Sequence, residues 1–206
     1  GNVSTLYARR EKTKDEIAQI ILSMIQQKKG NYLVFFPSYE YLKLVHESFS
    51  ALDAHVDIIT QIAGMTETER EWFISRFSRD NRETLVGFAV LGGVFGEGID
   101  LAGDRLAGAV IVGVGLPALC LERDLIREYY AVQSGEGFEF AYLYPGFNKV
   151  LQAAGRVIRS EEDRGAVLLI DSRFTSERYR ELFPGEWRPV TIHNDAHLFK
   201  TAQKFW

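Results

Sequence analysis

A short segment near position 155 combines one amide and two guanidinium side chains at helical spacing. Gln152, Arg156 and Arg159 fall within about 60° of one another at 3.6 residues per turn, and Gly155 lies beside them. The opposite side is apolar, with Val150, Ala154, Val157 and Ile158. Arginine forks fit phosphate oxygens, and no acid lies within the segment to neutralise them. The pattern predicts a helix that packs on one side and binds phosphate on the other, unless both arginines pair with nearby acids on a solvated face.

A second segment, residues 92–100, is rich in glycine and follows an apolar run. Glycine permits close approach of a ligand to the backbone, and loops beyond the carboxyl ends of strands often bind ligands in open α/β sheets. Glu97 and Asp100 place two carboxylates around Gly98. The alternative is an ordinary connection whose acids face water. The segment is not a P-loop, because no G-x-x-x-x-G-K-[ST] occurs in the chain. The usual means of holding ATP is therefore missing from this sequence.

A third segment places Ser38 and Tyr39 directly after the apolar run 32–36. The hydroxyl of Ser38, or the start of the following helix, can donate to a backbone phosphate, and Tyr39 can stack on a base. Ser38 can equally serve as the cap of that helix, and the two roles are compatible.

Apolar runs typical of buried strands alternate along the chain with amphipathic helices. We expect strands at 32–36, 56–62, 85–91, 109–114 and 166–171, with 138–144 ambiguous. We expect helices at 13–29, 39–50, 66–77, 121–130, 148–159, 173–182 and 195–206. Alternation of this kind predicts a doubly wound α/β fold with a mostly parallel sheet and helices on both faces. No linker or repeat divides the chain, so residues 1–206 form one expected domain.

Composition is that of an ordinary globular protein, with 206 residues, 46% of them hydrophobic. The net charge of −4 argues mildly against a dedicated nucleic-acid binder, which would carry an excess of Lys and Arg. Cys120 is the only cysteine and has apolar neighbours, so we expect a buried thiol and a reducing, cytoplasmic setting. No run is long and apolar enough to span a membrane. The chain begins with Gly1, and we expect it to be a fragment.

Taken in order, the three segments resemble motifs IV, V and VI of superfamily 2 helicases, and most closely the XPD/DinG group. The resemblance rests on residues 32–39, 93–101 and 152–159, with 163–165 behind the last, and on the strand and turn at 168–174. It runs from about Asn31 to Phe174. It implies the second RecA-like motor domain of an ATP-dependent DNA helicase, without the P-loop domain that holds ATP and Mg²⁺.

The resemblance also implies roles for individual residues. Arg156 and Arg159 would be arginine fingers, and Gln152 would sense the γ-phosphate beside Gly155. Nucleotide contacts are implied for Gly98 and Asp100, with Glu97 coupling the nucleotide to DNA. Contacts with single-stranded DNA are implied for Ser38, Tyr39 and Phe95. An iron–sulfur cluster, present in many relatives, would belong to the other motor half, and we expect no metal site in this one.

Two other interpretations remain open, and one residue departs from the family pattern. The chain could be a RecA-like module that binds DNA or protein without turnover, although it would then have no need for the arginine face. It could also be an unrelated α/β enzyme that uses Asp100 and Asp171 at strand ends. Gly96 stands where relatives commonly have a small hydroxyl residue, so no hydroxyl contact is expected there.

Overall fold

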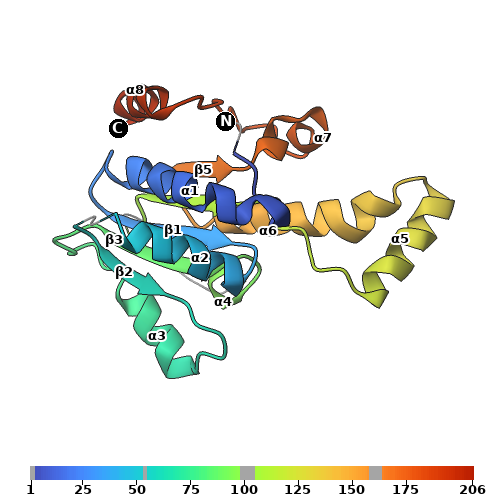
Figure 1. Ribbon diagram of the computed structural model, residues 1–206, viewed down its shortest axis with the longest axis horizontal. Coiled ribbons are helices and arrows are strands. Elements are labelled where there is room, and N and C mark those ends of the chain that lie inside the picture. Colours follow the sequence, from blue (N-terminus) through green and yellow to red (C-terminus); the bar gives the residue numbers. More distant parts are fainter. Residues whose placement is uncertain (1–2, 53–54, 98–104, 158–163) are drawn as a thin grey trace.

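The protein has a five-stranded parallel sheet covered by helices on both faces (Figure 1). A computed structural model describes residues 3–52, 55–97, 105–157 and 164–206. The strand order is β2-β3-β1-β4-β5, and every pair of neighbours is parallel. The strands are β1 (Asn31–Phe36), β2 (Asp57–Thr60), β3 (Leu85–Val90), β4 (Gly108–Val112) and β5 (Ala166–Ile170). The predicted doubly wound α/β fold is confirmed; β1 is one residue longer than expected, and the other four strands are one to three residues shorter.

The central strand shows why the sheet must be covered on both faces. All six residues of β1 are buried. Because side chains alternate along a strand, Leu33 and Phe35 enter one core while Tyr32, Val34 and Phe36 enter the other. A strand whose side chains are buried on both faces, here apolar at every position after Asn31, must lie between two layers of helices.

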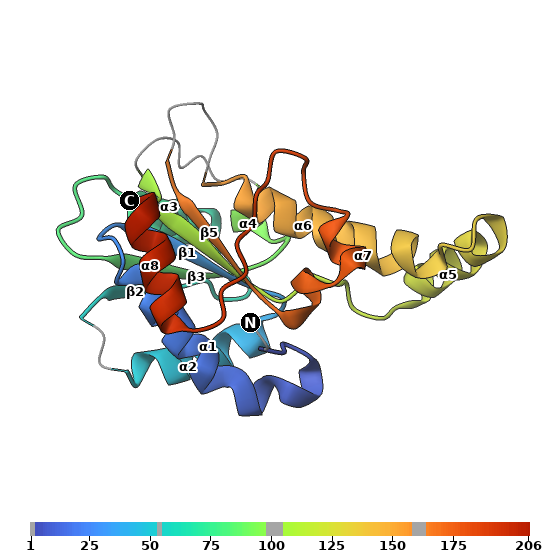
Figure 2. The ribbon, with the colours of Figure 1, turned by 90° about the horizontal axis from the view of Figure 1, so that it is seen from above.

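The helices divide between the two cores. One face is covered by α1 (Arg10–Ile25), α2 (Tyr39–Ser50) and α8 (Asp195–Phe205). The other is covered by α3 (Glu67–Ser75), α4 (Val94–Glu97), α6 (Tyr144–Ala154) and α7 (Glu177–Arg180). Figure 2 shows α1 and α8 crossing on the same side of the sheet. None of these described helices is long and apolar enough to cross a membrane.

Several predicted elements are wrong in their bounds or type. The glycine-rich segment was expected to be a loop, but Val94–Glu97 forms one turn of helix. The ambiguous stretch is a π-helix at Glu139–Leu143 that runs directly into α6, so this helix begins earlier than predicted and ends at Ala154. The helix predicted at 173–182 is a 3-10 turn, Ser172–Thr175, followed by the short α7.

Two glycines explain how α6 approaches the sheet. Gly115 has φ +68°, and a Cβ there would lie 2.6 Å from the carbonyl oxygen of Gly146. A Cβ on Gly146 would in turn lie 3.0 Å from the backbone of Leu116. The start of α6 therefore lies against the loop that follows β4 with backbone in contact with backbone, which only glycine allows.

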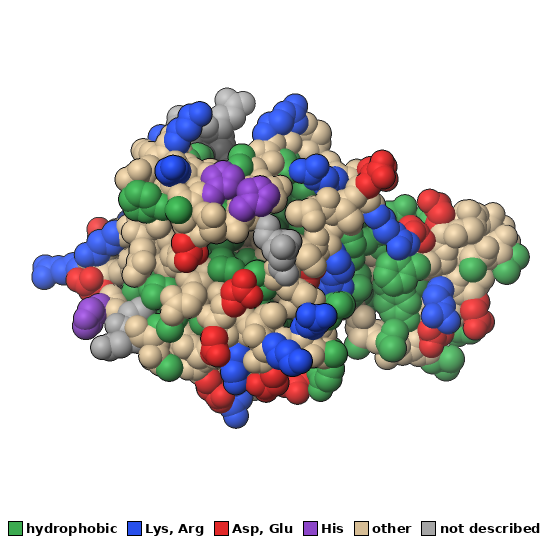
Figure 3. Space-filling view, turned by 45° about the horizontal axis from the view of Figure 1, so that its top comes forward, with side chains coloured by type: hydrophobic (Ala, Val, Ile, Leu, Met, Phe, Trp, Pro, Cys, Tyr) green, Lys and Arg blue, Asp and Glu red, His purple; other side chains and the backbone are tan. Residues whose placement is uncertain are grey.

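An arm projects from the body of the domain. It consists of α5 (Leu121–Gln133) and the π-helix before α6 (Figures 1 and 2). No residue of α5 is buried. Figure 3 shows hydrophobic side chains gathered on this arm, where Leu121, Leu125, Tyr129 and Val132 are exposed. Cys120, at its base, is exposed, so the predicted buried thiol is wrong.

Candidate functional site

The parallel sheet separates the candidate residues onto two opposite edges. Residues that follow strands gather at the carboxyl edge, and residues that precede strands gather at the amino edge. The helix α6 runs back from the carboxyl edge, so its end lies near the start of β5. The chain leaves β3 at the carboxyl edge at Gly92 and must reach the amino edge by Arg105, because β4 begins at Gly108. The glycine-rich segment 92–100 thus begins at the carboxyl edge, and its residues 98–100 lie outside the described residues.

At the amino edge, the end of α6 presents polar groups outward and apolar groups inward. Gln152 and Gly155 are exposed, and Arg156 is half-buried and makes at least one contact. The opposite side is buried, as predicted, through Val150, Ala154 and Val157. The amide and guanidinium thus lie outside the core, which is the arrangement that phosphate binding requires.

The helix predicted through Arg159 stops at Ala154. The amide of Arg156 donates to the carbonyl of Ala153 over 3.2 Å, and that of Val157 to Ala154 over 3.1 Å. Bonds between residues three apart tighten the last turn into 3-10 geometry. The angular argument that placed three side chains on one α-helical face therefore holds only as far as this turn. Arg159 lies outside the described residues.

Gly165 fixes this turn against the sheet. A Cβ at Gly165 would lie 2.2 Å from Cγ1 of Val157 and 3.2 Å from the carbonyl oxygen of Ala107. The turn that carries Arg156 therefore packs on the residue just before β5. The sequence pattern assigned no role to this glycine.

The other predicted nucleotide contacts fall largely outside what the structure describes. Gly98 and Asp100 lie in the undescribed stretch 98–104. Glu97 ends α4, and its side chain is not described. The described donors at the end of α6 are an amide and a guanidinium, which suit phosphate oxygens rather than a metal ion. Among the described residues, no three His, Cys, Asp or Glu side chains are grouped closely enough to hold one.

At the carboxyl edge, the structure brings Ser38 and Tyr39 together with residues from β2 and β3. The hydroxyl of Ser38 accepts from the amide of Tyr41 over 3.3 Å, so the capping role is confirmed. The hydroxyl of Tyr39 accepts from Nε2 of Gln61 over 2.9 Å, and Oε1 of Gln61 accepts from the amide of Val90 over 2.8 Å. Gln61 is buried and holds the Tyr39 ring, which is 38% exposed, over the ends of two strands.

Phe95 does not belong to this surface. Its side chain is 0% exposed and stacks on Phe73 of α3 with ring centroids 4.2 Å apart. The prediction that Phe95 contacts nucleic acid is wrong in this structure, because α4 turns the ring into the core.

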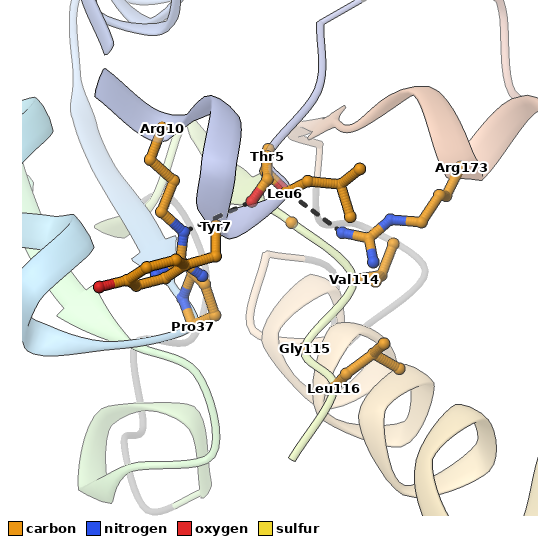
Figure 4. A pocket seen from close by; sticks show the side chains of 10 residues that line it. Thr5, Leu6, Tyr7, Arg10, Pro37, Val114, Gly115, Leu116 and Arg173 are labelled. Carbon is orange, nitrogen blue, oxygen red and sulfur yellow. Dashed lines mark hydrogen bonds between the residues drawn. The ribbon is translucent and has the colours of Figure 1, made fainter. Parts of the chain in front are cut away.

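A pocket of about 120 Å³ opens at the same edge, and residue spacing alone did not predict it (Figure 4). Two arginines from opposite ends of the chain line it. Arg10 lies over the ring of Tyr41 at 4.4 Å, and its Nε is 3.4 Å from the carbonyl of Thr5. Arg173 lies across the pocket, following β5. Between them the floor is formed by the loop after β4, at Gly113 and Gly115.

Asp171 holds Arg173 in place. Its Oδ1 accepts from Nε of Arg173 at 2.8 Å and its Oδ2 accepts from Nη2 at 2.9 Å, while the hydroxyl of Thr5 also donates to Oδ2. Burial alone would raise the pKa of Asp171, but the bonds from Arg173 and Thr5 hold that pKa below its ordinary value. Each carboxylate oxygen accepts at least two hydrogen bonds, and the side chain is 1% exposed. Asp171 therefore positions Arg173, which argues against its use as a catalytic acid.

The parallel sheet with helices on both faces defines a RecA-like α/β domain. Residues 21–190 match the family described as the helicase C-terminal domain, and the chain belongs to that family. Its relatives are XPD/DinG-like helicases of superfamily 2. The ATP-dependent DNA helicase YoaA of Haemophilus influenzae is 28% identical over 83% of this chain. A Drosophila melanogaster homolog of regulator of telomere elongation helicase 1 is 31% identical over 82% of it.

Solved structures agree with this assignment. A structure titled XPD_APO matches 87% of the chain with a TM-score of 0.70 and 25% identity, over 36% of its own length. Another, titled XPD_Helicase, matches 87% with a TM-score of 0.69 and 27% identity, over 32% of its length. The predicted RecA-like fold is confirmed. The chain spans 26% of YoaA and 18% of the Drosophila relative, so it corresponds to one part of those longer proteins.

Proposed function

We propose that this chain is the second motor domain of an ATP-dependent DNA helicase and is catalytic only within the full-length protein. The observation that carries the proposal is the end of α6, where Gln152, Gly155 and Arg156 lie outside the core at the amino edge. A guanidinium there can stabilise the charge that develops on a phosphoryl group in transfer.

At the nucleotide, Arg156 and Arg159 act as arginine fingers, and Gln152 donates its amide to the γ-phosphate. Gly98 and Asp100 line the same cleft. They belong to the link between β3 and β4, which comprises residues 91–107. The P-loop domain of the same protein supplies the site for ATP, and Mg²⁺ bound there neutralises phosphate charge. An iron–sulfur cluster, where present, belongs to that other half. The domain alone is therefore expected to be inactive.

At the carboxyl edge, single-stranded DNA crosses the ends of the strands. Tyr39 offers an exposed ring for base stacking, and Ser38 lies beside it at the start of α2. Arg10 adds positive charge to the nearby pocket, and Arg173, whose charge is balanced by Asp171, adds guanidinium donors, so a backbone phosphate can bind there. These contacts explain how a chain with net charge −4 binds nucleic acid, because the cations are local.

Glu97 lies on the link between the two edges, since α4 follows the carboxyl edge and β4 begins at the amino edge. The link therefore joins the proposed contacts with single-stranded DNA to the proposed contacts with the nucleotide. Closure of the two motor domains on ATP, and release after hydrolysis, then moves the strand.

The test is DNA-stimulated ATPase activity of the full-length protein with Arg156→Ala. We expect kcat to fall by about 10³-fold or more, with ATP binding retained. The matched control is Arg127→Ala, which removes an arginine from α5 on the projecting arm. Turnover near that of the wild type in Arg156→Ala would overturn the finger assignment. Strand binding without ATPase activity in the wild type would indicate a non-catalytic module instead.

A further inference from the structure

The helix α3 contacts both described ends of the link between β3 and β4. One contact is a ring stack on α4, and the other is a set of hydrogen bonds from Arg105, just before β4. Both contacts lie at the carboxyl end of α3, because Phe73 and Ile74 are neighbours in its last turn and Phe77 follows it. No residue of α3 was identified as functional from the sequence.

The first contact is built into the core. Phe73 and Phe95 are both 0% exposed, and their rings stack with an interplanar angle of 24°. The sheet makes room for α3 through Gly87, where a Cβ would lie 2.5 Å from Cζ of Phe77 and 3.1 Å from Cζ of Phe73. The position of α4 therefore follows the position of α3.

The second contact caps the carboxyl end of α3. Nε of Arg105 donates to the carbonyl of Phe77 over 2.8 Å, and Nη2 donates to the carbonyl of Ile74 over 3.2 Å. The last carbonyls of a helix lack partners within it, and the helix dipole favours a cation at that end. A guanidinium can serve two carbonyls at once because its donors diverge in one plane.

The backbone of Arg105 is held by a buried asparagine. Nδ2 of Asn31 donates to the carbonyl of Arg105 over 2.9 Å and to that of Ser78 over 2.8 Å. Oδ1 of Asn31 accepts from Nδ2 of Asn81 over 2.8 Å. Asn31 is 3% exposed and begins the central strand. The start of β4 is thus tied to β1 by its backbone and to α3 by its side chain.

We infer that α3 is a positioning element for coupling, and that Arg105 and Phe73 are its positioning residues. The inference rests on the proposed function, in which the link between β3 and β4 joins the contacts with single-stranded DNA to the contacts with the nucleotide. Phe73 holds α4, which follows β3, and Arg105 holds the end of the link that precedes β4. A shift of the last turn of α3 moves both ends of the link together, because one turn makes both contacts. Neither residue touches the nucleotide or the strand.

The test compares Arg105→Lys with Arg70→Lys in the full-length protein. Arg70 lies on the same helix and, among the described residues, forms an exposed ion pair with Glu67 at 3.4 Å, so its replacement is the matched control. In Arg105→Lys one ammonium cannot serve both carbonyls. We expect the KM for ATP to rise by no more than about tenfold, because the lost charged hydrogen bond lies within the domain and affects the nucleotide only through the link, and we expect stimulation by oligo(dT) to fall. Arg70→Lys should match the wild type in both.

Phe73→Leu tests the other end. It removes the ring stack while keeping an apolar side chain, so stimulation by oligo(dT) should fall while the KM for ATP without DNA stays within twofold of the wild type. This split between the two variants is a readout that a general loss of stability would not produce. Equal KM values and equal stimulation in Arg105→Lys and the wild type would overturn the inference.

Hydrogen exchange of the same full-length variants makes the result independent of turnover. Arg105→Lys should increase exchange in the peptides covering 67–77 and 105–108, with the peptides of α1 and α2 unchanged. Unchanged exchange at both places would also overturn the inference, even if activity falls. If the wild type lacks DNA-stimulated ATPase while the exchange pattern is as expected, the proposed function fails and the structural coupling of α3 stands.

Discussion

Asp171 shows how a buried charge can position a functional one. Its carboxylate lies at the carboxyl end of β5 and is almost fully buried, yet it bonds both Arg173 and Thr5, which come from opposite ends of the chain. An isolated buried carboxylate would be costly, so the pair is stable only because both oxygens are satisfied. The consequence is a guanidinium held at the mouth of the pocket with a fixed orientation.

Replacing Asp171 by Asn should destabilise the domain by about 2–3 kcal/mol at pH 7. Breaking a buried ion pair costs about 3–5 kcal/mol, and the 29% exposure of Arg173 reduces that figure. Urea unfolding measures the change. The control is Glu83→Gln, whose ion pair with Lys29 is exposed on both sides and should contribute less than about 1 kcal/mol. Equal losses in the two variants would contradict the argument.

The pH dependence of stability has a definite sign. The pKa of Asp171 is lower in the folded protein than its ordinary value. Such a group stabilises the fold above its unfolded pKa of about 4, and this contribution is lost as the pH falls from there towards the folded pKa. The free energy of unfolding should therefore fall more steeply below pH 4 in the wild type than in Asp171→Asn. Parallel curves from acid titration would show that the carboxyl is not the cause.

Tyr39 allows stacking to be separated from hydrogen bonding. Tyr39→Phe loses only the bond from Gln61, whereas Tyr39→Ala loses the exposed ring. We expect Tyr39→Phe to bind oligo(dT) within about twofold of the wild type in the full-length protein. Tyr39→Ala should lose about 1–3 kcal/mol of binding, which is the usual contribution of one base stacked on an aromatic ring. Equal effects of the two variants would indicate that the hydroxyl, not the ring, makes the contact.

Single residues were predictable where their role is local. The cap at Ser38 and the outward direction of Gln152 both follow from the order of residues along one element. Gln61, Arg10 and Arg173 were not identified, because their partners lie on distant parts of the chain and only the folded sheet brings them together. Phe95 was misassigned because the sequence gives no sign of which way a short helical turn faces.

At the scale of elements, the sequence predicted the buried strands more accurately than it predicted where helices end. The strands were found because each is a short apolar run between turn residues, and all five were predicted. The helix expected at 66–77 begins one residue later, where Thr66 and Glu69 form a capping box. The end of α6 was not predicted, since a helix and a 3-10 turn share nearly the same apolar spacing over a few residues.

Gly87 gives a prediction about how α3 packs on the sheet. Gly87→Ala places a methyl group against the rings of Phe77 and Phe73, which are packed on all sides and cannot move away freely. Overpacking of this kind costs about 1–3 kcal/mol. The control is Gly64→Ser, where a Cβ meets nothing within 4 Å and only the left-handed backbone of φ +75° opposes the change. Thermal unfolding measures the change. A midpoint temperature of Gly87→Ala equal to that of the wild type would contradict the argument.

At the scale of the whole molecule, the sheet keeps the proposed nucleotide contacts apart from the proposed contacts with single-stranded DNA. The five residues of β4 span about 17 Å between the two edges. Neither edge is a closed site by itself. The pocket at the carboxyl edge is about 120 Å³, which is small beside a typical ligand site, and the amino edge offers an exposed turn. Under the proposed function, a second domain completes the nucleotide cleft.

This division predicts how the isolated chain differs from the full-length protein. Coupling between two ligands requires that each bind the same conformational states with different affinity. In the full-length protein, a non-hydrolysable ATP analogue should change the affinity for oligo(dT) by about 5–150-fold, the usual range of such coupling. In the isolated chain of 206 residues the same analogue should leave that affinity unchanged and should itself bind weakly.

Fluorescence anisotropy of a labelled oligo(dT), with and without the analogue, measures the DNA affinity of both proteins. Both are measured at one salt concentration, because affinity for DNA depends steeply on salt. Arg156→Ala in the full-length protein tests whether this arginine causes the coupling. The variant should reduce the effect of the analogue on oligo(dT) affinity, while the affinity without nucleotide stays unchanged. A nucleotide-dependent affinity in the isolated chain would mean that these 206 residues already contain a complete cleft. The amino-edge turn would then bind nucleotide without a neighbouring domain.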